Sequence, residues 1–175
     1  MGYLEKKLQA IISTLDAWKL KTGNLYVMTS DSLPSPFVAS AYNNGAYNII
    51  GSPYMAFNNN KASYYQCSYT DNNAYIGALI NLNKIIKLRK LAINLENVSG
   101  FTNNTRGYVE VYNNGSWVNV YDSGAKVNAW SVDTTLNLEY DLVTQIRARS
   151  VYTSGATAGQ GRIKELQITE WYEKG

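Results

Sequence analysis

The sequence has 175 residues, enough for one domain and a short appendage, and its 45% hydrophobic content allows a buried core. Only 17% of the residues are charged and the formal net charge is +3, which argues against the concentrated basic face typical of nucleic-acid binding. One cysteine, Cys67, and no histidine exclude an internal disulfide and remove the usual members of zinc sites and of Ser-His or Cys-His catalytic sets.

The first 22 residues predict an amphipathic helix that ends at the helix stop Thr22-Gly23-Asn24. Its apolar residues are spaced alternately three and four apart and form a heptad seam: Leu8 and Leu15 at a, and Leu4, Ile11 and Trp18 at d. We interpret residues 1–23 as a coiled-coil oligomerisation stalk, with a helix lying on its own domain as the alternative. The seam leaves dimer and trimer open, and we favour a trimer because fibres are usually three-fold.

From Asn24 onward the apolar period changes to two, which is typical of half-buried strands. The stretch YVEVYNNGSWVNVY (108–121) alternates on both sides of Asn114-Gly115, which predicts a hairpin with a type I′ turn. In KLAINLE, Leu91, Ile93 and Leu95 share one face. Short strands separated by polar turns predict an antiparallel β-sandwich or jelly roll over residues 24–175.

Several segments resemble discoidin, or coagulation-factor C-type, domains and related galactose-binding-like jelly rolls. The stretch AFNNNKASYYQ (56–66) is similar to their signature A-[FL]-[DN]-G-[DN]-x-x-[ST]-x-W, and the matching strand segments follow in the family's order over residues 37–172. Two departures lie in this stretch: Tyr64 or Tyr65 replaces the usual Trp, and Asn59 stands where Gly is common. The resemblance implies a small β-sandwich that binds glycans, or occasionally phospholipids, through loops at one end.

The resemblance also implies a structural calcium site in the loop 58–63. The matching ligand positions are Asn58, Asn60, Ser63 and Glu165. Calcium prefers carboxylates, and two of the usual acidic positions are Asn in this sequence. We therefore expect the ion to be weakly bound or absent, with the asparagines capping the turn through their side chains.

A ligand site is predicted where such domains carry their ligands, around the loop NVSGFTNNTRG (97–107). This loop combines amides, an aromatic ring and a guanidinium, which suits the hydroxyls and the apolar face of a sugar. The predicted ligand-binding residues are Asn97, Phe101, Asn103, Asn104, Arg106, Tyr152 and Tyr69. The many Asn and Tyr residues fit an uncharged, hydroxyl-rich partner, although they can equally reflect the compositional bias of the source genome. The carboxylates Asp71, Asp122, Asp133 and Asp141 lie in no catalytic motif, so we do not expect an enzyme.

A stalk that leads directly into a sugar-binding type of sandwich is the layout of a viral or phage fibre. The sequence has no signal-peptide pattern and no apolar run of about 18 residues, so we expect no membrane insertion. We interpret the chain as a trimeric virion attachment protein on the particle surface, bound to other virion proteins and to a host-surface carbohydrate. The alternatives are a structural head-fibre or capsid decoration protein, and a carbohydrate-binding module of a larger secreted protein.

Overall fold

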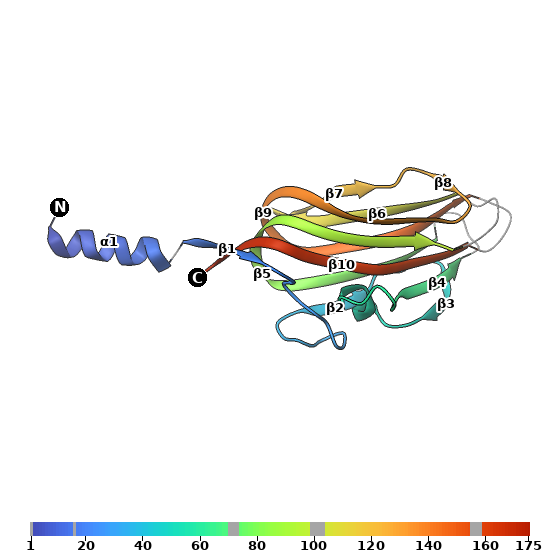
Figure 1. Ribbon diagram of the computed structural model, residues 1–175, viewed down its shortest axis with the longest axis horizontal. Coiled ribbons are helices and arrows are strands. Elements are labelled where there is room, and N and C mark those ends of the chain that lie inside the picture. The colour runs from blue at the N-terminus through green and yellow to red at the C-terminus, as the bar shows by residue number, and fades with distance from the viewer. Residues whose placement is uncertain (1, 16, 70–73, 99–103, 155–158) are drawn as a thin grey trace.

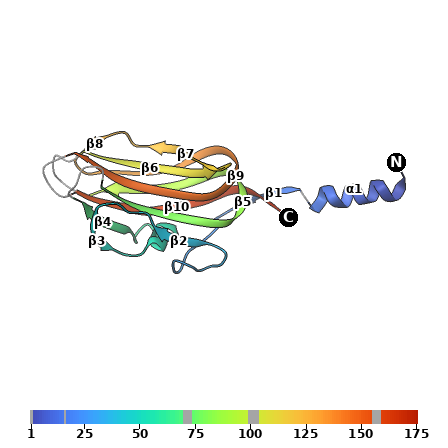
Figure 2. The same cartoon turned by 180° about the vertical axis from the view of Figure 1, so that it is seen from behind.

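The computed structural model describes residues 2–15, 17–69, 74–98, 104–154 and 159–175. A single α-helix, α1 (Tyr3–Leu15), extends from one end of a two-layered β-sandwich, and the C-terminus lies at the same end (Figures 1 and 2). The strands are β1 (Trp18–Thr22), β2 (Val38–Ala41), β3 (Ala46–Ile50), β4 (Tyr65–Tyr69), β5 (Tyr75–Asn97), β6 (Asn104–Asn113), β7 (Ser116–Asp122), β8 (Lys126–Val127), β9 (Trp130–Ser154) and β10 (Gly159–Lys174), with a short 3₁₀ helix η1 (Pro53–Phe57). The described helix is too short to span a membrane.

Two long strands, β5 and β9, join the two layers. They pair antiparallel from Tyr75↔Val151 to Asn97↔Trp130, with register shifts between Asn81 and Lys90, and both ribbons turn back at the end near α1 (Figure 1). Asn83 lies where the register between β5 and β9 breaks, and it has a left-handed backbone with a φ of 51°. Its N–H donates to Oδ1 of Asn81 (3.0 Å). One long strand pair therefore supplies adjacent strands to both faces of the core.

Each of the two layers contains its own set of strands in addition to its parts of β5 and β9. In the first layer, the beginning of β5 lies between β2 and the end of β9, and β6 and β7 follow beyond β9. In the second layer, the end of β5 lies between the beginning of β9 and β10, and the far edge of β10 pairs with both β4 and β1. Strand β3 continues this layer beyond β4. All these pairings are antiparallel, as the sequence predicts.

The core lies between the layers and follows the predicted alternation. Leu91, Ile93 and Leu95 are fully buried, so their assignment to one core-facing side is confirmed. Each such side chain contributes about 1.5–3 kcal/mol through burial. The β6–β7 hairpin turns at Asn114 and Gly115 with φ of 49° and 83°, which confirms the predicted turn. Cys67 is buried as well, and desolvation raises the pKa of its thiol to about 12.

The predicted helix is too long at its C-terminal end. It ends at Leu15, and Trp18 begins strand β1, which pairs with β10 from Trp18↔Lys174 to Thr22↔Glu170. The segment WKLKT fits a period of two as well as a heptad, and the edge of β10 supplies backbone partners that a short isolated helix lacks. Trp18 is therefore not a d residue of the stalk. Gly23 does adopt a left-handed φ (107°), but it ends a strand.

Several apolar side chains are exposed at the end of the molecule where α1 leaves the sandwich. Leu4 and Leu8 on α1 are 80% and 59% exposed, whereas the side chains of Ile11 and Leu15 fall outside the described structure. At this end of the sandwich, an open hollow of about 640 Å³ is lined by Trp18, Lys84, Ile85, Leu142, Glu173 and Lys174. The coiled-coil interpretation of α1 remains a prediction.

Candidate functional site

The end of β5 and the beginning of β6, which flank the predicted ligand loop, lie at the end of the sandwich opposite α1 (Figure 1). Phe101 and Asn103 lie outside the described residues. Tyr69 and Asn104 are the terminal residues of β4 and β6, and their side chains are likewise outside the described structure. Of the predicted set, Arg106 is the residue whose described side chain reaches the surface, with an exposed fraction of 37%.

Two residues predicted to contact a ligand are buried instead. Asn97 and Tyr152 are each only 1% exposed. They lie within β5 and β9, which extend further than the sequence indicates, and they occupy core-facing positions. The Asn97 amide donates to the carbonyl oxygen of Asn128 (3.2 Å). Such buried side chains offer a ligand little surface, so the structure does not support their assignment to the ligand site.

Arg106 is held rigidly at the surface of β6. Its Nε donates to Oδ1 of Asp122 (2.7 Å), and its Nη2 donates to the other carboxylate oxygen. This two-point hydrogen bonding lowers the pKa of Asp122 and raises that of Arg106. The guanidinium also lies over the ring of Tyr108, 5.0 Å from its centroid. The sequence places Arg106 on a loop, but the strand and these contacts fix its position.

Arg149 continues the same surface on the neighbouring strand. It is the cross-strand partner of Tyr108, and its guanidinium carbon lies 4.7 Å from the centroid of that ring. On its other strand neighbour it lies 5.6 Å from the ring of Tyr75. Its Nε is 3.6 Å from Oε2 of Glu110, and its side chain is 28% exposed.

Arg147 lies two residues away on the same face and is more enclosed. Its guanidinium carbon lies 3.9 Å from the ring centroid of Trp117 and 4.5 Å from that of Tyr42. Glu110 accepts two hydrogen bonds from it, from Nε (2.8 Å) and Nη2 (3.1 Å). Its side chain is only 13% exposed.

These groups form one continuous arrangement, because the rings of Tyr42 and Tyr75 are themselves only 5.2 Å apart. We call it the arginine–aromatic row: Arg106, Tyr108, Arg149, Tyr75, Tyr42, Arg147 and Trp117. Each cation–π contact adds about 0.5–2 kcal/mol, more where water is excluded. The row therefore presents planar donors and ring edges in fixed positions on the outer face of the first layer.

Gly77 allows the row to form. It lies on β5 opposite Arg149, and a Cβ there would meet the carbonyl oxygen of Tyr42 at 2.2 Å and its ring at 2.9 Å. The N–H of Tyr42 donates to the Gly77 carbonyl (2.7 Å), and the N–H of Gly77 donates to Oδ1 of Asn43 (3.0 Å). Because Gly77 has no side chain, the backbone of Tyr42 packs directly against the backbone of β5.

Sequence reasoning missed the row, although the signal is present. On β6, Val109 and Val111 are fully buried, so the intervening Tyr108 and Glu110 face outward. On β9 the buried Ala148 separates Arg147 from Arg149 in the same way. The outward residues of both strands thus alternate with the core, but cross-strand register is needed to see that they are neighbours.

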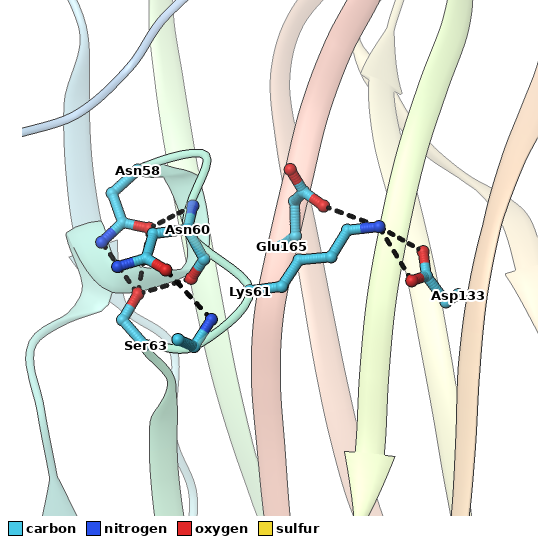
Figure 3. Close-up of polar contacts among 7 residues, drawn as sticks. Asn58, Asn60, Lys61, Ser63, Asp133 and Glu165 are labelled. Carbon is cyan, nitrogen blue, oxygen red and sulfur yellow. Dashed lines mark hydrogen bonds and ion pairs between the residues drawn. The ribbon is translucent and has the colours of Figure 1, made fainter.

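The loop 58–63 is closed by its own side chains (Figure 3). Oδ1 of Asn58 accepts the N–H of Asn60 (3.0 Å), and Oδ1 of Asn60 accepts that of Ala62 (3.0 Å). The Asn58 amide donates to the Ser63 hydroxyl (2.8 Å). Asn59 has a φ of 55°, a conformation that asparagine tolerates in place of glycine. The expected capping of this turn by asparagine side chains is confirmed.

Glu165, the remaining predicted calcium ligand, interacts with a lysine. Nζ of Lys61 lies 3.6 Å from Oε2 of Glu165, and 2.7 and 2.8 Å from the two carboxylate oxygens of Asp133 (Figure 3). Burial raises the pKa of Glu165, and Lys61 acts in the opposite direction. Within the described residues, no group of three or more acidic, cysteine or histidine side chains could hold a metal ion. A loop of two amides and a hydroxyl bonded to one another, beside a carboxylate that faces an ammonium, does not fit calcium.

No protein-family model and no curated protein matches this chain. Among solved structures, it is similar to a family 32 carbohydrate-binding module from Clostridium perfringens in complex with GlcNAc-α-1,4-galactose (TM-score 0.50, 16% identity, covering 73% of this chain and 87% of that one). It is also similar to the family 32 module of C. perfringens NanJ in complex with galactose (TM-score 0.49, 19% identity, 78% and 93% covered). Chitosan-binding module 1 from a Paenibacillus sp. IK-5 chitosanase/glucanase gives a TM-score of 0.49 (14% identity, 87% and 100% covered). At these identities the likeness concerns the fold, and the sandwich of this chain is an antiparallel jelly roll of the kind found in family 32 carbohydrate-binding modules.

Proposed function

We propose that the sandwich is a non-catalytic carbohydrate-binding module whose contact surface is the arginine–aromatic row together with the loops beside Arg106. The arginine–aromatic row is the main observation that supports this proposal. Ring edges and apolar CH groups suit the faces of a sugar, and guanidinium forks suit its vicinal hydroxyls. The jelly-roll fold supports the proposal, since structures of this fold have been solved with bound galactose-containing sugars.

A glycan array tests this proposal with a matched pair of arginine variants. Arg106→Ala should reduce binding of the glycan selected by the parent protein about tenfold or more, because a guanidinium that hydrogen-bonds a buried or charged partner contributes about 1.5–3 kcal/mol. Arg89→Ala is the control. Arg89 also lies over a tyrosine ring, Tyr172 (5.4 Å), and also pairs with an aspartate, Asp141 (2.8 Å), but outside the row.

The control should bind as the parent does. If the parent protein selects no glycan, the carbohydrate-binding proposal is wrong. If both variants bind equally well, the site lies away from Arg106.

We further propose that the module acts as the head of an attachment protein on a virion surface, trimerised through α1. The exposed Leu4 and Leu8 on α1 support self-association, as do Leu20 and Ile85 at the same end of the sandwich, each 51% exposed. A shallow site on one head binds at about millimolar strength, and linked copies can gain about a hundredfold or more through effective concentration. Other virion proteins and a host-surface carbohydrate are the proposed partners.

The competing functions are a structural head-fibre or decoration protein and a module of a larger secreted protein. The fold comparison favours the second of these, because the similar structures are carbohydrate-binding modules. Selective glycan binding argues against the purely structural role. An oligomer held by α1 favours the attachment protein over a module within a secreted enzyme.

A further inference from the structure

We propose that Arg149 binds the carboxylate of an acidic sugar, so that the ligands of this module are glycans containing uronic or sialic acid. This inference rests on the proposed carbohydrate-binding function and deepens it, because it assigns a charge to the ligand. It starts from a difference between the three arginines of the arginine–aromatic row.

Two of the three guanidinium groups are already occupied by carboxylates. Arg106 makes a two-point contact with Asp122, and Arg147 makes one with Glu110. Among the described residues, the carboxylate nearest to Arg149 is Glu110, whose Oε2 lies 3.6 Å from Nε of Arg149 and whose two oxygens already accept hydrogen bonds from Arg147. Within the described residues, no hydrogen bond to Nη1 or Nη2 of Arg149 is found, and its buried Nε has none either.

The surroundings of Arg149 make this free fork suited to an anion. The rings of Tyr108 and Tyr75 lie 4.7 and 5.6 Å away and limit its rotation. Three guanidinium groups face two carboxylates here, so the row keeps one positive charge without a matching negative group. Hydrogen bonds from a guanidinium to a carboxylate are about twice as strong as those to neutral oxygens. A sugar carboxylate therefore gains more from Arg149 than a hydroxyl does.

The test compares an oligogalacturonate with its methyl ester, which has the same sugar backbone without the charge. By titration calorimetry at low salt, the acid should bind at least about tenfold more tightly than the ester, a difference that corresponds to about 1.4 kcal/mol. Arg149→Gln should remove this preference. Arg89→Gln, which changes net charge equally outside the row, should keep it.

Four results would overturn the inference in distinguishable ways. Equal binding of acid and ester means that the module recognises neutral hydroxyls, and this result would leave the proposed carbohydrate-binding function unaffected. An acid preference that survives in Arg149→Gln means that the sugar carboxylate binds elsewhere on the module. A preference that disappears equally in Arg89→Gln means that it depends only on the net charge of the protein. If no glycan binds on an array, the proposed function itself fails.

A second, independent observation concerns the loop 58–63. We infer that the ammonium of Lys61 is a built-in cation that fastens this loop to the second layer in place of a calcium ion. Lys61 leaves the loop toward β10 and β9, where it meets Glu165 and Asp133 (Figure 3).

Of the two contacts of Lys61, we expect the one with Glu165 to contribute more to stability than the one with Asp133. The Glu165 side chain is only 6% exposed, and Lys61 is the cation paired with it among the described residues. Asp133 is 55% exposed, and exposed ion pairs contribute little. Removing the partner of a buried carboxylate, in contrast, leaves an uncompensated charge. The loop thus has both its turn and its attachment without an added ion.

Thermal unfolding of the full chain tests this role. The melting temperature of the parent should be the same with calcium or with a chelator, and Lys61→Met should lower it by about 4 °C or more in both. Asp133→Asn should have a smaller effect. Lys126→Met is the control, since Lys126 is exposed on β8.

A rise of several degrees on adding calcium to the parent would show that the loop binds the ion. A Lys61→Met melting temperature equal to that of the control would show that Lys61 is only a solvated side chain. Either result overturns the inference.

Discussion

A chain that begins at Ala17 should be monomeric and should bind a densely glycosylated surface about a hundredfold more weakly than the full chain. The truncation removes α1 with its exposed Leu4 and Leu8 but leaves β1 paired with β10. A 13-residue helix is marginal alone, so we expect its seam to pack against partner chains. Light scattering gives the oligomeric state, and surface plasmon resonance on immobilised glycan gives the loss of avidity.

Leu8→Glu is the matched point variant, because it places a charge in the seam and keeps the chain length. It should reproduce the truncation. A truncated chain that remains oligomeric would place the contact between copies on the sandwich, and a monomeric full chain would refute the stalk.

Gly77→Ala should lower the free energy of unfolding by about 2–3 kcal/mol, as overpacking of a closely packed site does. The new Cβ would lie 2.2 Å from the carbonyl oxygen of Tyr42, so the backbone has to move and the hydrogen bond from the Tyr42 N–H to the Gly77 carbonyl is strained. The displaced Tyr42 also leaves Arg147 without one of its two rings. Chemical denaturation measures the stability, and glycan binding should fall with it.

A double variant separates the two contacts at Gly77. Tyr42→Ala removes the ring that the new Cβ would touch at 2.9 Å but keeps the carbonyl oxygen at 2.2 Å. Adding Tyr42→Ala should therefore not rescue Gly77→Ala. Full rescue would show that the ring, and not the backbone, sets the requirement for glycine.

The parts of the fold that the sequence predicts well are those set by local chemistry. Asn114-Gly115 turns a hairpin because both residues adopt positive φ, and Leu91, Ile93 and Leu95 face the core because strand side chains alternate. The loop 58–63 is similar: its asparagine side chains accept hydrogen bonds from backbone N–H groups two residues further along the chain. Such features depend on few neighbours, so a sequence pattern indicates them directly.

The predictions that failed depended on distant partners. Trp18 satisfies a heptad and a strand equally well, and the edge of β10 decides between them. The sequence places Tyr152 in a loop because nothing in its own segment shows that β9 extends to Ser154. The arginine–aromatic row joins strands that are far apart in sequence, such as Tyr75 and Arg149, and its members become neighbours only through the register of β5 and β9.

The pairing of β1 with β10 also determines how the molecule carries mechanical load. Helix α1 leads into β1 at one end of the sandwich, and the beginning of β6, which carries Arg106, lies at the other end (Figure 1). Tension between a ligand there and an anchor on α1 runs along the strands, at right angles to the hydrogen bonds of an antiparallel ladder. The five residue pairs from Trp18↔Lys174 to Thr22↔Glu170 are then loaded in shear and must yield together. Pulling on the two chain termini instead would separate β1 from β10 one residue pair at a time. The pairing of β1 with β10 therefore resists tension between α1 and a ligand better than tension between the two termini.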